Sequence, residues 1–477
     1  MAQKVDNKSD SYVIDTAKNS SQKLPSLVKK LYKQGAVKQV DSLMLSVLSV
    51  LIENHDIETI DRELPRLTKI ISANSGVQAA YNLLSRIEVM FQLRKPRIGI
   101  YDHTLHIIGG GQKYGCTLAY ALQNDADITF IANRKVTHQD LKRWYDLDLV
   151  DCKIKVIPLP FFEEKSFDEI DPLVINSRTE NPFHLISRES GNYDIFINNS
   201  MLEKVYPLSN ISILVCHFPE RRRSSYFYAD KYTYVVYNSK YTAEWIQKKW
   251  KIVPTTHIYP PVDLGNSNKM PEKEDIILSV ARFEKGGSKQ QLMMAKVFTA
   301  LSQSHPKELK NWRLVLAGGS VDKNPYLEKI ENFLSSGQTK NIDSRVNIPL
   351  NDLKSLYKKA KIFWHFCGFN QSDPALVEHF GMSIVESMQN WCVPIVFNGG
   401  GQREIVKQGV SGFLFSSIKE LRDMTLEAMK NMTLWKDLSQ GAYRRGMLFT
   451  KEVFMDKVKK LFKQIMHTYF SPPSNES

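Results

Sequence analysis

From Arg97 onward, the sequence alternates short β-rich runs with stretches that can form helices. The runs before position 240 are "RIGIYD", "ADITFIAN", "CKIKVIPL", "YDIFINNS", "ISILVCHF" and "YTYVVYNS". Strands separated by helical stretches pair in parallel, and their crossover helices cover the faces of the sheet. The sequence therefore predicts an α/β fold with a doubly wound sheet.

The same rhythm restarts after a linker. Prolines, polar residues and charges gather in "YPPVDLGNSNKMPEKED", residues 259–275, which is typical of a domain boundary. The β-rich runs then resume with "DIILSVARF", "WRLVLAGG", "AKIFWHFC", "VPIVFNGG" and "SGFLF". Two Rossmann-like halves of this kind bind ligands in the cleft at the carboxyl ends of their strands.

The residues before Arg97 follow a different pattern. "AAYNLLSRIEVMF" has apolar residues at three-to-four spacing, which predicts a helix. Leu43–Ile52 is apolar nearly all round and predicts a buried helix, and Pro65 predicts a helix boundary nearby. We therefore expect four parts. Residues 1–95 would form a helical N-terminal extension with a disordered start, and residues 96–265 and 266–445 would form two Rossmann-like domains. Residues 446–477 would form a C-terminal amphipathic basic helix that packs back across the domains.

The composition is that of a globular protein, with 42% hydrophobic and 24% charged residues. Five scattered cysteines without a CxxC pair argue against a disulfide framework or a zinc site and favour a reducing compartment. The polar start "MAQKVDNKSDSYVIDTAKNS" lacks the apolar core of a signal peptide. We expect a soluble cytoplasmic protein, with peripheral contact to the inner membrane face as a further option.

The formal charge of +13 indicates a partner that carries negative charge. Nucleic acid, an anionic membrane surface and a phosphate-bearing substrate would each fit. Lys and Arg are spread along the chain, and no zinc finger, basic zipper or RNP motif is present. We expect phosphorylated ligands or an anionic membrane surface, and no nucleic acid.

The segment "EHFGMSIVE" places two acids around a helix start. Gly381, Met382 and Ser383 would form the first turn, whose free N–H groups and positive dipole end suit an anion. Glu378 precedes this turn and Glu386 lies within the helix, so both can face one cleft wall. From this stretch alone, a surface helix with two solvated glutamates remains an open alternative.

A basic loop follows the first strand of the second half. "SVARFEKGGSKQQ" carries Arg282, Lys285 and Lys289 around two glycines. Such a loop can cradle a diphosphate, because arginine makes forked contacts and lysine supplies a point charge. The loop is not a Walker motif, since GxxxxGK[ST] is absent. A solvated basic turn is the alternative if the loop is considered alone.

Two glycine loops stand between a strand and a helix. Gly400 lies in "VPIVFNGGGQREIV", and Gly109, Gly110 and Gly111 lie in "HTLHIIGGGQKYG". Glycines there allow a ligand to approach the backbone closely. The second loop is not the dinucleotide fingerprint GxGxxG, and Asn133 stands where an NAD enzyme would have an acid, so an NAD enzyme is disfavoured.

One histidine follows a strand of the first half directly. His217 in "ILVCHFP" would lie at the cleft edge, a position at which an imidazole is more often functional than elsewhere in a protein. His103 and His106 could suggest a metal, but no third ligand presents itself, and we expect no metal site.

Taken together, "SVARF…GGSKQQ", "EHFGMSIVES", "CVPIVFNGGGQREIV…GVSGFLF", "IGGGQKYG" and "VCHFP" resemble the family-four retaining glycosyltransferases of the GT-B fold. The resemblance covers Arg97 to the C-terminus and is closest to bacterial enzymes of surface-polysaccharide assembly. "EHFG" also resembles mannosyltransferases that build lipid-linked oligosaccharides. Trp391 departs from the family pattern, in which small residues are usual at this position.

The resemblance implies roles for the acids and the basic loop. Glu386 would hold the ribose hydroxyls of a nucleotide sugar, and Glu378 would lie beside the donor sugar near the reacting carbon. Arg282 and Lys289 would neutralise the diphosphate, with Lys285 as the rival for the role of the lysine.

The resemblance also implies contacts from the backbone and from the first half. The backbone from Gly381 to Ile384 would meet phosphate and sugar oxygens, and His217 would contact the donor sugar from the opposite domain. Gly110 and Gly111 would border the diphosphate and the acceptor pocket.

The function implied is a retaining hexosyltransferase. It would move a sugar from a nucleotide diphosphate sugar to a glycan or lipid-linked acceptor in polysaccharide or glycoconjugate assembly, with no cofactor required. Residues 96–265 would then be the acceptor domain and residues 266–445 the nucleotide-sugar domain. The alternatives are a non-catalytic GT-B scaffold of another glycosyltransferase and a nucleotide-sugar epimerase.

Overall fold

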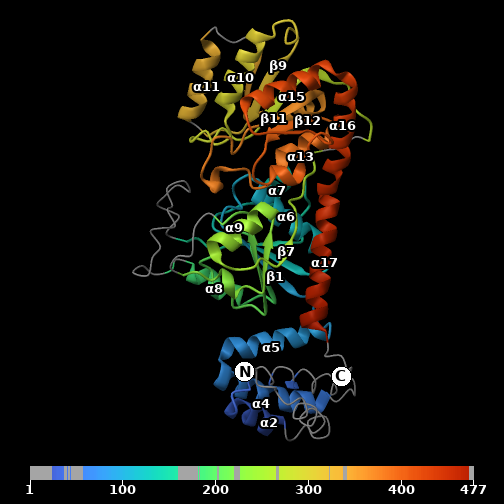
Figure 1. Cartoon of the computed structure of the whole chain (residues 1–477). Helices are drawn as coiled ribbons and strands as arrows, with labels where there is room; N and C mark the ends of the chain where they lie inside the picture. The colour runs from blue at the N-terminus through green and yellow to red at the C-terminus, as the bar shows by residue number, and fades with distance from the viewer. Residues whose placement is uncertain are drawn as a thin grey trace, which may run out of the picture.

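The structure is a computed structural model that describes residues 24–36, 40, 43–44, 57–159, 181, 183–200, 203–219, 226–264, 268–321, 323–336 and 341–471. Two sheet domains lie one above the other, and a helical layer lies beneath the N-terminal domain (Figure 1). The expected disordered start and most of the apolar segment Leu43–Ile52 lie outside the described residues.

The N-terminal sheet contains seven parallel strands in the order β3-β2-β1-β4-β5-β6-β7. Its central strands are buried runs such as "ISILVC", which is what a sheet covered on both faces requires. The strands are β1 Arg97–Asp102, β2 Asp127–Ala132, β3 Lys153–Val156, β4 Ile195–Asn198, β5 Ile211–Cys216, β6 Tyr234–Tyr237 and β7 Thr256–His257.

Two helices of this domain, α7 and α9, begin at side-chain caps. The Ser239 side chain accepts a hydrogen bond from the N–H of Thr242 at the start of α9, and Thr137 forms a capping box with Asp140 at the start of α7. Apolar clusters lie on both faces of the sheet. The helices are α6 Gly110–Leu122, α7 His138–Tyr145, α8 His184–Ser190 and α9 Lys240–Trp250, with the short 3₁₀ helix η5 Ala229–Lys231.

The C-terminal sheet contains six parallel strands in the order β10-β9-β8-β11-β12-β13. The prediction of two doubly wound parallel sheets is therefore confirmed. The strands are β8 Glu274–Val280, β9 Arg313–Gly318, β10 Ile342–Val346, β11 Ala360–His365, β12 Val393–Phe397 and β13 Phe413–Phe415.

Helices cover both faces of the C-terminal sheet, and each face has its own apolar cluster. Trp391 lies just after the helix that contains Glu386, and its ring stacks on Tyr443 with ring centroids 4.3 Å apart. The helices are α10 Gln291–Ser304, α11 Pro325–Ser335, α12 Leu350–Lys359, α13 Met382–Gln389, α14 Gln402–Ile405, α15 Ile418–Lys430 and α16 Met432–Gly446, with η6 Pro374–Leu376 and η7 Met447–Phe449.

The N-terminal extension contains α2 Leu24–Lys33, α4 Ile57–Ser75 and α5 Val77–Met90. The helix boundary expected near Pro65 is wrong, because Pro65 lies inside α4. Proline removes one hydrogen bond from a helix interior. Here the turns after it bury Leu67 and Ile71 in the apolar cluster shared with α5, and this packing stabilises the continued helix.

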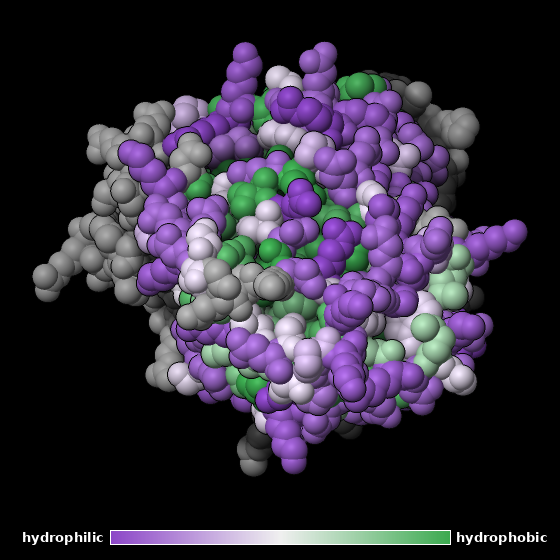
Figure 2. Space-filling model, turned by 90° about the horizontal axis from the view of Figure 1, so that it is seen from above, coloured by the Kyte–Doolittle hydropathy of each residue, from purple (hydrophilic) through white to green (hydrophobic). Residues whose placement is uncertain are grey.

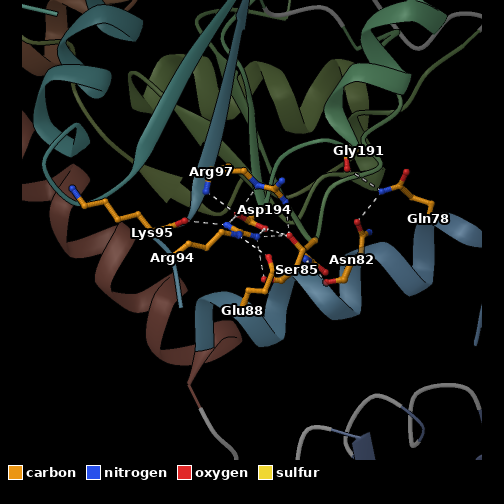
Figure 3. A network of polar contacts seen from close by, with 10 residues as sticks. Gln78, Asn82, Ser85, Glu88, Arg94, Lys95, Arg97, Gly191 and Asp194 are labelled. Atoms are coloured by element: carbon orange, nitrogen blue, oxygen red, sulfur yellow. Dashed lines mark hydrogen bonds and ion pairs between the residues drawn. The ribbon is translucent and has the colours of Figure 1, made fainter. Parts of the chain in front are cut away.

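A polar network joins α5 to the start of the N-terminal sheet (Figure 3). Asp194, at the start of β4, is fully buried and accepts two hydrogen bonds from the Arg94 guanidinium at 2.6 and 2.9 Å. Ser85 of α5 donates to the same carboxylate. These contacts lie at the strand ends opposite the cleft, so the extension docks away from the candidate site.

The last helix, α17 Lys451–Phe470, leaves the C-terminal domain and runs along the N-terminal domain to α5 (Figure 1). It buries Phe454, Val458 and Ile465 in the same cluster as α6. The Arg86 guanidinium donates to the carbonyl of Tyr469, which ties the end of α17 to the extension. The apolar face of this basic helix is therefore covered by the N-terminal domain.

Hydrophilic side chains dominate the outer end of the C-terminal domain, and apolar side chains show toward the middle of that face (Figure 2). All five cysteines are buried, and none of them forms a disulfide. Among the residues that the structure describes, no helix combines the length and the apolar character needed to cross a bilayer.

Candidate functional site

The predicted glycine loop of the first half meets the predicted helix start of the second. Gly109 caps α6, and Gly110 lies so close to α13 that a β-carbon added there would be 2.8 Å from Met382 Sδ. These positions lie at the carboxyl ends of the central strands of both sheets. The structure thus brings the motifs of both halves together at one junction between the two domains (the cleft), where doubly wound sheets favour ligand binding.

Glu378 is the centre of a charged cluster beside this contact. One carboxylate oxygen, Oε2, lies 3.0 Å from Lys289 Nζ and 2.9 Å from His365 Nε2. Burial opposes ionisation of this carboxyl, but the charge of Lys289 and the hydrogen bond with His365 outweigh burial and hold the pKa of Glu378 well below its usual value. Burial likewise opposes the charge of Lys289, and Glu378 raises the pKa of that ammonium above its usual value.

Three side chains with possible metal-ligand atoms lie close together here. Ligand atoms of His365, Cys367 and Glu378 are within 4.8 Å of one another. The Lys289 ammonium lies between two of them, 3.3 Å from Cys367 Sγ and 3.0 Å from Glu378 Oε2. Burial raises the pKa of the Cys367 thiol to about 12, so the thiol is neutral at neutral pH. An internal cation therefore already balances the Glu378 carboxylate.

The start of α13 is built to receive an anion. Gly381 caps the helix at a φ of 111°, and no side chain of the described residues caps the first turn by a hydrogen bond. Ile384 is fully buried, while Met382 and Ser383 are partly exposed. The N–H groups of Met382 and Ser383 thus lie toward the cleft, with the positive end of the helix dipole behind them. The N–H of Ile384 instead donates to the Gly381 carbonyl at 3.1 Å.

Glu386 lies on α13 and is partly exposed. One of its carboxylate oxygens accepts a hydrogen bond of 2.9 Å from the Tyr357 hydroxyl. Burial lowers the pKa of Lys113 of α6, and the Glu386 charge opposes this effect from across the cleft. A group bound between the two domains at this point would therefore meet a carboxylate and an ammonium.

The second glycine loop holds the backbone of Glu378. The Gly401 N–H donates to the Glu378 carbonyl at 2.8 Å. Gly400 has a φ of 55°, and a β-carbon there would be 2.2 Å from the same carbonyl oxygen. The glycines of "NGGG" thus serve the close approach of two protein loops, whereas the sequence predicted that they would admit a ligand.

The three cations of the basic loop differ in their surroundings. The Arg282 side chain is 73% exposed and pairs only with nearby Glu284 at 3.2 Å in the described part of the chain. Lys285 is exposed. Lys289 alone reaches into the charged cluster around Glu378. Arg282 and Lys285 are therefore free to swing toward a ligand, whereas Lys289 is fixed.

His217 follows β5 directly and faces the first glycine loop. A β-carbon added at Gly111 would lie 3.3 Å from His217 Nε2, and the ring packs edge-on against Tyr114 with centroids 5.2 Å apart. His217 Nε2 is buried without a hydrogen-bond partner among the described residues. Burial lowers the pKa of His217 to about 4, so the ring is neutral at neutral pH.

Several residues of the site were not predicted from the sequence. The carboxylate of Glu404 on α14 accepts hydrogen bonds from the backbone N–H of Lys240 and Tyr241, at the start of α9 in the other domain. His379 stacks on Phe218 across the same cleft. His365 was predicted only as part of a strand, although its place at the carboxyl end of that strand was a usable signal.

Residues 264–445 match the family described as "Glycosyl transferases group 1". This segment contains the acids, the basic loop and the second glycine loop. The first glycine loop, His217 and the helical extension lie outside the match.

Curated relatives include GDP-Man:Man(3)GlcNAc(2)-PP-Dol alpha-1,2-mannosyltransferase of Homo sapiens, which is 28% identical over 252 residues, 48% of this chain and 49% of that protein. Alpha-1,3/1,6-mannosyltransferase ALG2 of Rhizomucor pusillus is 23% identical over 339 residues, 59% of this chain and 73% of that protein. The chain spans about half the length of the first of these relatives.

Solved structures of similar fold include the Anabaena protein HepE in complex with UDP and glucose, with a TM-score of 0.58 and 15% identity over 77% of this chain and 100% of that one. A sucrose-phosphate synthase from Thermosynechococcus elongatus gives a TM-score of 0.57 and 15% identity over 78% of this chain and 100% of that one. The two sheet domains thus have the GT-B fold.

Proposed function

Because residues 264–445 form a glycosyl transferases group 1 domain, we propose that this chain is a retaining glycosyltransferase. It moves a hexose from a nucleotide diphosphate sugar to a glycan or lipid-linked acceptor. The observation that carries the proposal is the close approach of Gly110 to Met382. Because of this approach, the start of α13, Glu378 and His217 lie near one another at the junction of the two domains.

The proposed chemistry uses charges that are already in place. Transfer from a nucleotide sugar builds negative charge on the departing diphosphate, and fixed donors aimed at that charge supply a large part of catalysis. The amides at the start of α13 and the side chains of Arg282 and Lys285 provide these donors. Glu386 takes the ribose hydroxyls, Glu378 lies beside the donor sugar, and His217 contacts that sugar from the other domain.

The anomeric configuration of the sugar is retained if the acceptor attacks from the same side from which the diphosphate departs. The departing phosphate then accepts the proton of the acceptor hydroxyl, and no enzyme nucleophile is needed. Because Lys289 already balances the charge of Glu378, we expect no divalent cation in the reaction. Equal transfer rates with and without a strong chelator are the expected result, and loss of transfer that added Mg²⁺ restores would contradict this part.

The names of the relatives suggest the first substrates to test. We propose mannose as the sugar, GDP-mannose as its donor and a lipid-linked oligosaccharide as the acceptor, because the human relative is named for these compounds. No observation on this chain favours the scaffold or the epimerase alternative.

The test is donor turnover measured with and without a mannose-terminated acceptor. The proposal predicts GDP release that depends on the acceptor, together with a new glycoside of the same anomeric configuration as the donor. Turnover without any acceptor would favour the epimerase, and no turnover with any nucleotide sugar would favour the scaffold. Either result would overturn the proposal.

We further propose that the protein works at an anionic membrane surface on the cytoplasmic side, where a lipid-linked acceptor would lie. The net charge of +13 supports this, whereas the apolar face of α17 is already covered. Contact would therefore be electrostatic, and salt should weaken it. Equal sedimentation with anionic vesicles at low and high salt would contradict an electrostatic contact.

A further inference from the structure

The two oxygens of Glu378 have different surroundings. Oε2 bonds to both Lys289 Nζ and His365 Nε2, at 3.0 and 2.9 Å. Within the described part of the chain, no hydrogen bond or ion pair reaches Oε1. The side chain is 17% exposed, so the carboxylate still reaches the cleft. One oxygen is held by the protein and the other is left for a ligand.

His365 is placed to hold this carboxylate rigidly. It is the last residue of β11, its side chain is only 2% exposed, and its ring lies nearly parallel to Phe363, at 12° with centroids 6.3 Å apart. A carboxylate only accepts hydrogen bonds, so His365 Nε2 carries the proton in this contact. The other ring nitrogen, Nδ1, is buried without a partner among the described residues.

The backbone of Glu378 is fixed as well. Gly401 donates its N–H to the Glu378 carbonyl at 2.8 Å, so the residue is held at both ends. Rotating the side chain would break two contacts with Oε2 at once and leave the buried ring of His365 without its acceptor. Buried donors without an acceptor cost free energy, which opposes such a rotation.

We propose that His365 is a positioning residue that, together with Lys289, fixes Glu378 by Oε2 and directs Oε1 at a hydroxyl of the bound sugar. The sugar ligand rests on the proposed function, whereas the fixed carboxylate does not. The same arrangement engages Lys289 with Glu378. The groups that neutralise the diphosphate are therefore Arg282, Lys285 and the start of α13.

The test compares two replacements of His365 in the full chain. His365→Gln keeps an N–H donor of similar reach, and His365→Leu removes the donor. His138→Leu is the matched control, because His138 also bonds through Nε2, to the Cys152 carbonyl at 2.7 Å, but in the N-terminal domain. Thermal unfolding of each variant verifies that it folds before it is compared.

The first readout is transfer kinetics. We expect His365→Leu to lower kcat about 10- to 100-fold, because a hydrogen bond to a charged group is lost, with a smaller change in KM for the donor. His365→Gln should recover most of this loss, and His138→Leu should behave as the unchanged protein. A raised KM with unchanged kcat, or a Gln variant as impaired as the Leu variant, would overturn the proposal.

The second readout needs no activity. The ¹³C carboxyl signal of Glu378 can be assigned by its loss in Glu378→Gln and then titrated. Because His365 stabilises the carboxylate, His365→Leu should move this titration to higher pH, whereas the Gln and His138 variants should not. An unmoved titration would overturn the positioning role. An absence of transfer in the unchanged protein would overturn only the proposed function, because the titration still decides the placement of Glu378.

Discussion

The rings of Phe218 and His379 lie face to face across the two domains, with centroids 3.9 Å apart and an angle of 2° between their planes. Phe218 follows His217, and His379 follows Glu378. The stack therefore joins the two loops that carry these candidate residues. The Lys249 ammonium of α9 lies 5.0 Å from the centroid of the Phe218 ring, so a cation also contacts this aromatic pair.

Replacing His379 should loosen this contact between the domains. Aromatic pairs contribute about 0.5–1.5 kcal/mol beyond the area they bury. His379→Leu should therefore lower kcat/KM about 2- to 10-fold, because closure of the cleft becomes less favourable. Transfer kinetics measure this effect. His305→Leu, a histidine at the end of α10, serves as the control, and an equal effect in both variants would contradict a role for the stack.

The Arg94–Asp194 pair should be a main support of the helical extension. Asp194 is fully buried and Arg94 is 22% exposed, and removing one partner of such a pair typically costs about 3–5 kcal/mol. Asp194→Asn should lower the free energy of unfolding by an amount in this range, as measured in urea. Asp140→Asn removes the partner of exposed Arg143 and should have a much smaller effect. Similar losses in the two variants would be inconsistent with a buried, essential pair.

The two sheets were predictable because their central strands are apolar runs separated by helical stretches of suitable length. "ISILVC" and "EDIILSV" are buried along most of their length, and short apolar runs bounded in this way are typical of buried parallel strands. Edge strand β10 was missed because "IDSRV" alternates polar residues and stays half exposed. Strand β7 was missed because it has only two residues.

The individual site residues were predictable where a glycine follows a strand or an acid lies near a predicted helix start. The partners of those residues were not predictable, because contacts such as Lys289–Glu378 and Phe218–His379 join positions far apart in the sequence. The same limit applies to Pro65, whose effect on α4 was decided by tertiary packing rather than by local preference.

Acid should destabilise the protein through its buried histidines. Burial lowers the pKa of His217 and of His379 to about 4, from 6.5. Between pH 6.5 and 4 the unfolded chain therefore binds protons that the folded protein does not, so stability is lost as the pH falls through this window. Each histidine contributes a slope of up to about 1.4 kcal/mol per pH unit.

Urea unfolding at several pH values measures this slope. His217→Gln should reduce the slope between pH 6.5 and 4, because one of the protonations that act in this window is removed. A slope that His217→Gln does not change would mean that His217 is protonated in the folded protein at mildly acidic pH.

The proposed donor site predicts different effects of replacing its two acids and its arginine. Arg282→Ala and Glu386→Ala should each weaken the affinity for GDP-mannose about 10- to 100-fold, since a hydrogen bond to a charged group contributes about 1.5–3 kcal/mol. Glu378→Ala should mainly lower turnover, because its contact with the sugar matters most at the reacting carbon. Calorimetry measures the affinities and acceptor-dependent GDP release measures the turnover. Arg422→Ala on α15, whose guanidinium bonds to Ser304, is the control. Unchanged affinity in both the Arg282 and Glu386 variants would place the nucleotide elsewhere on the protein.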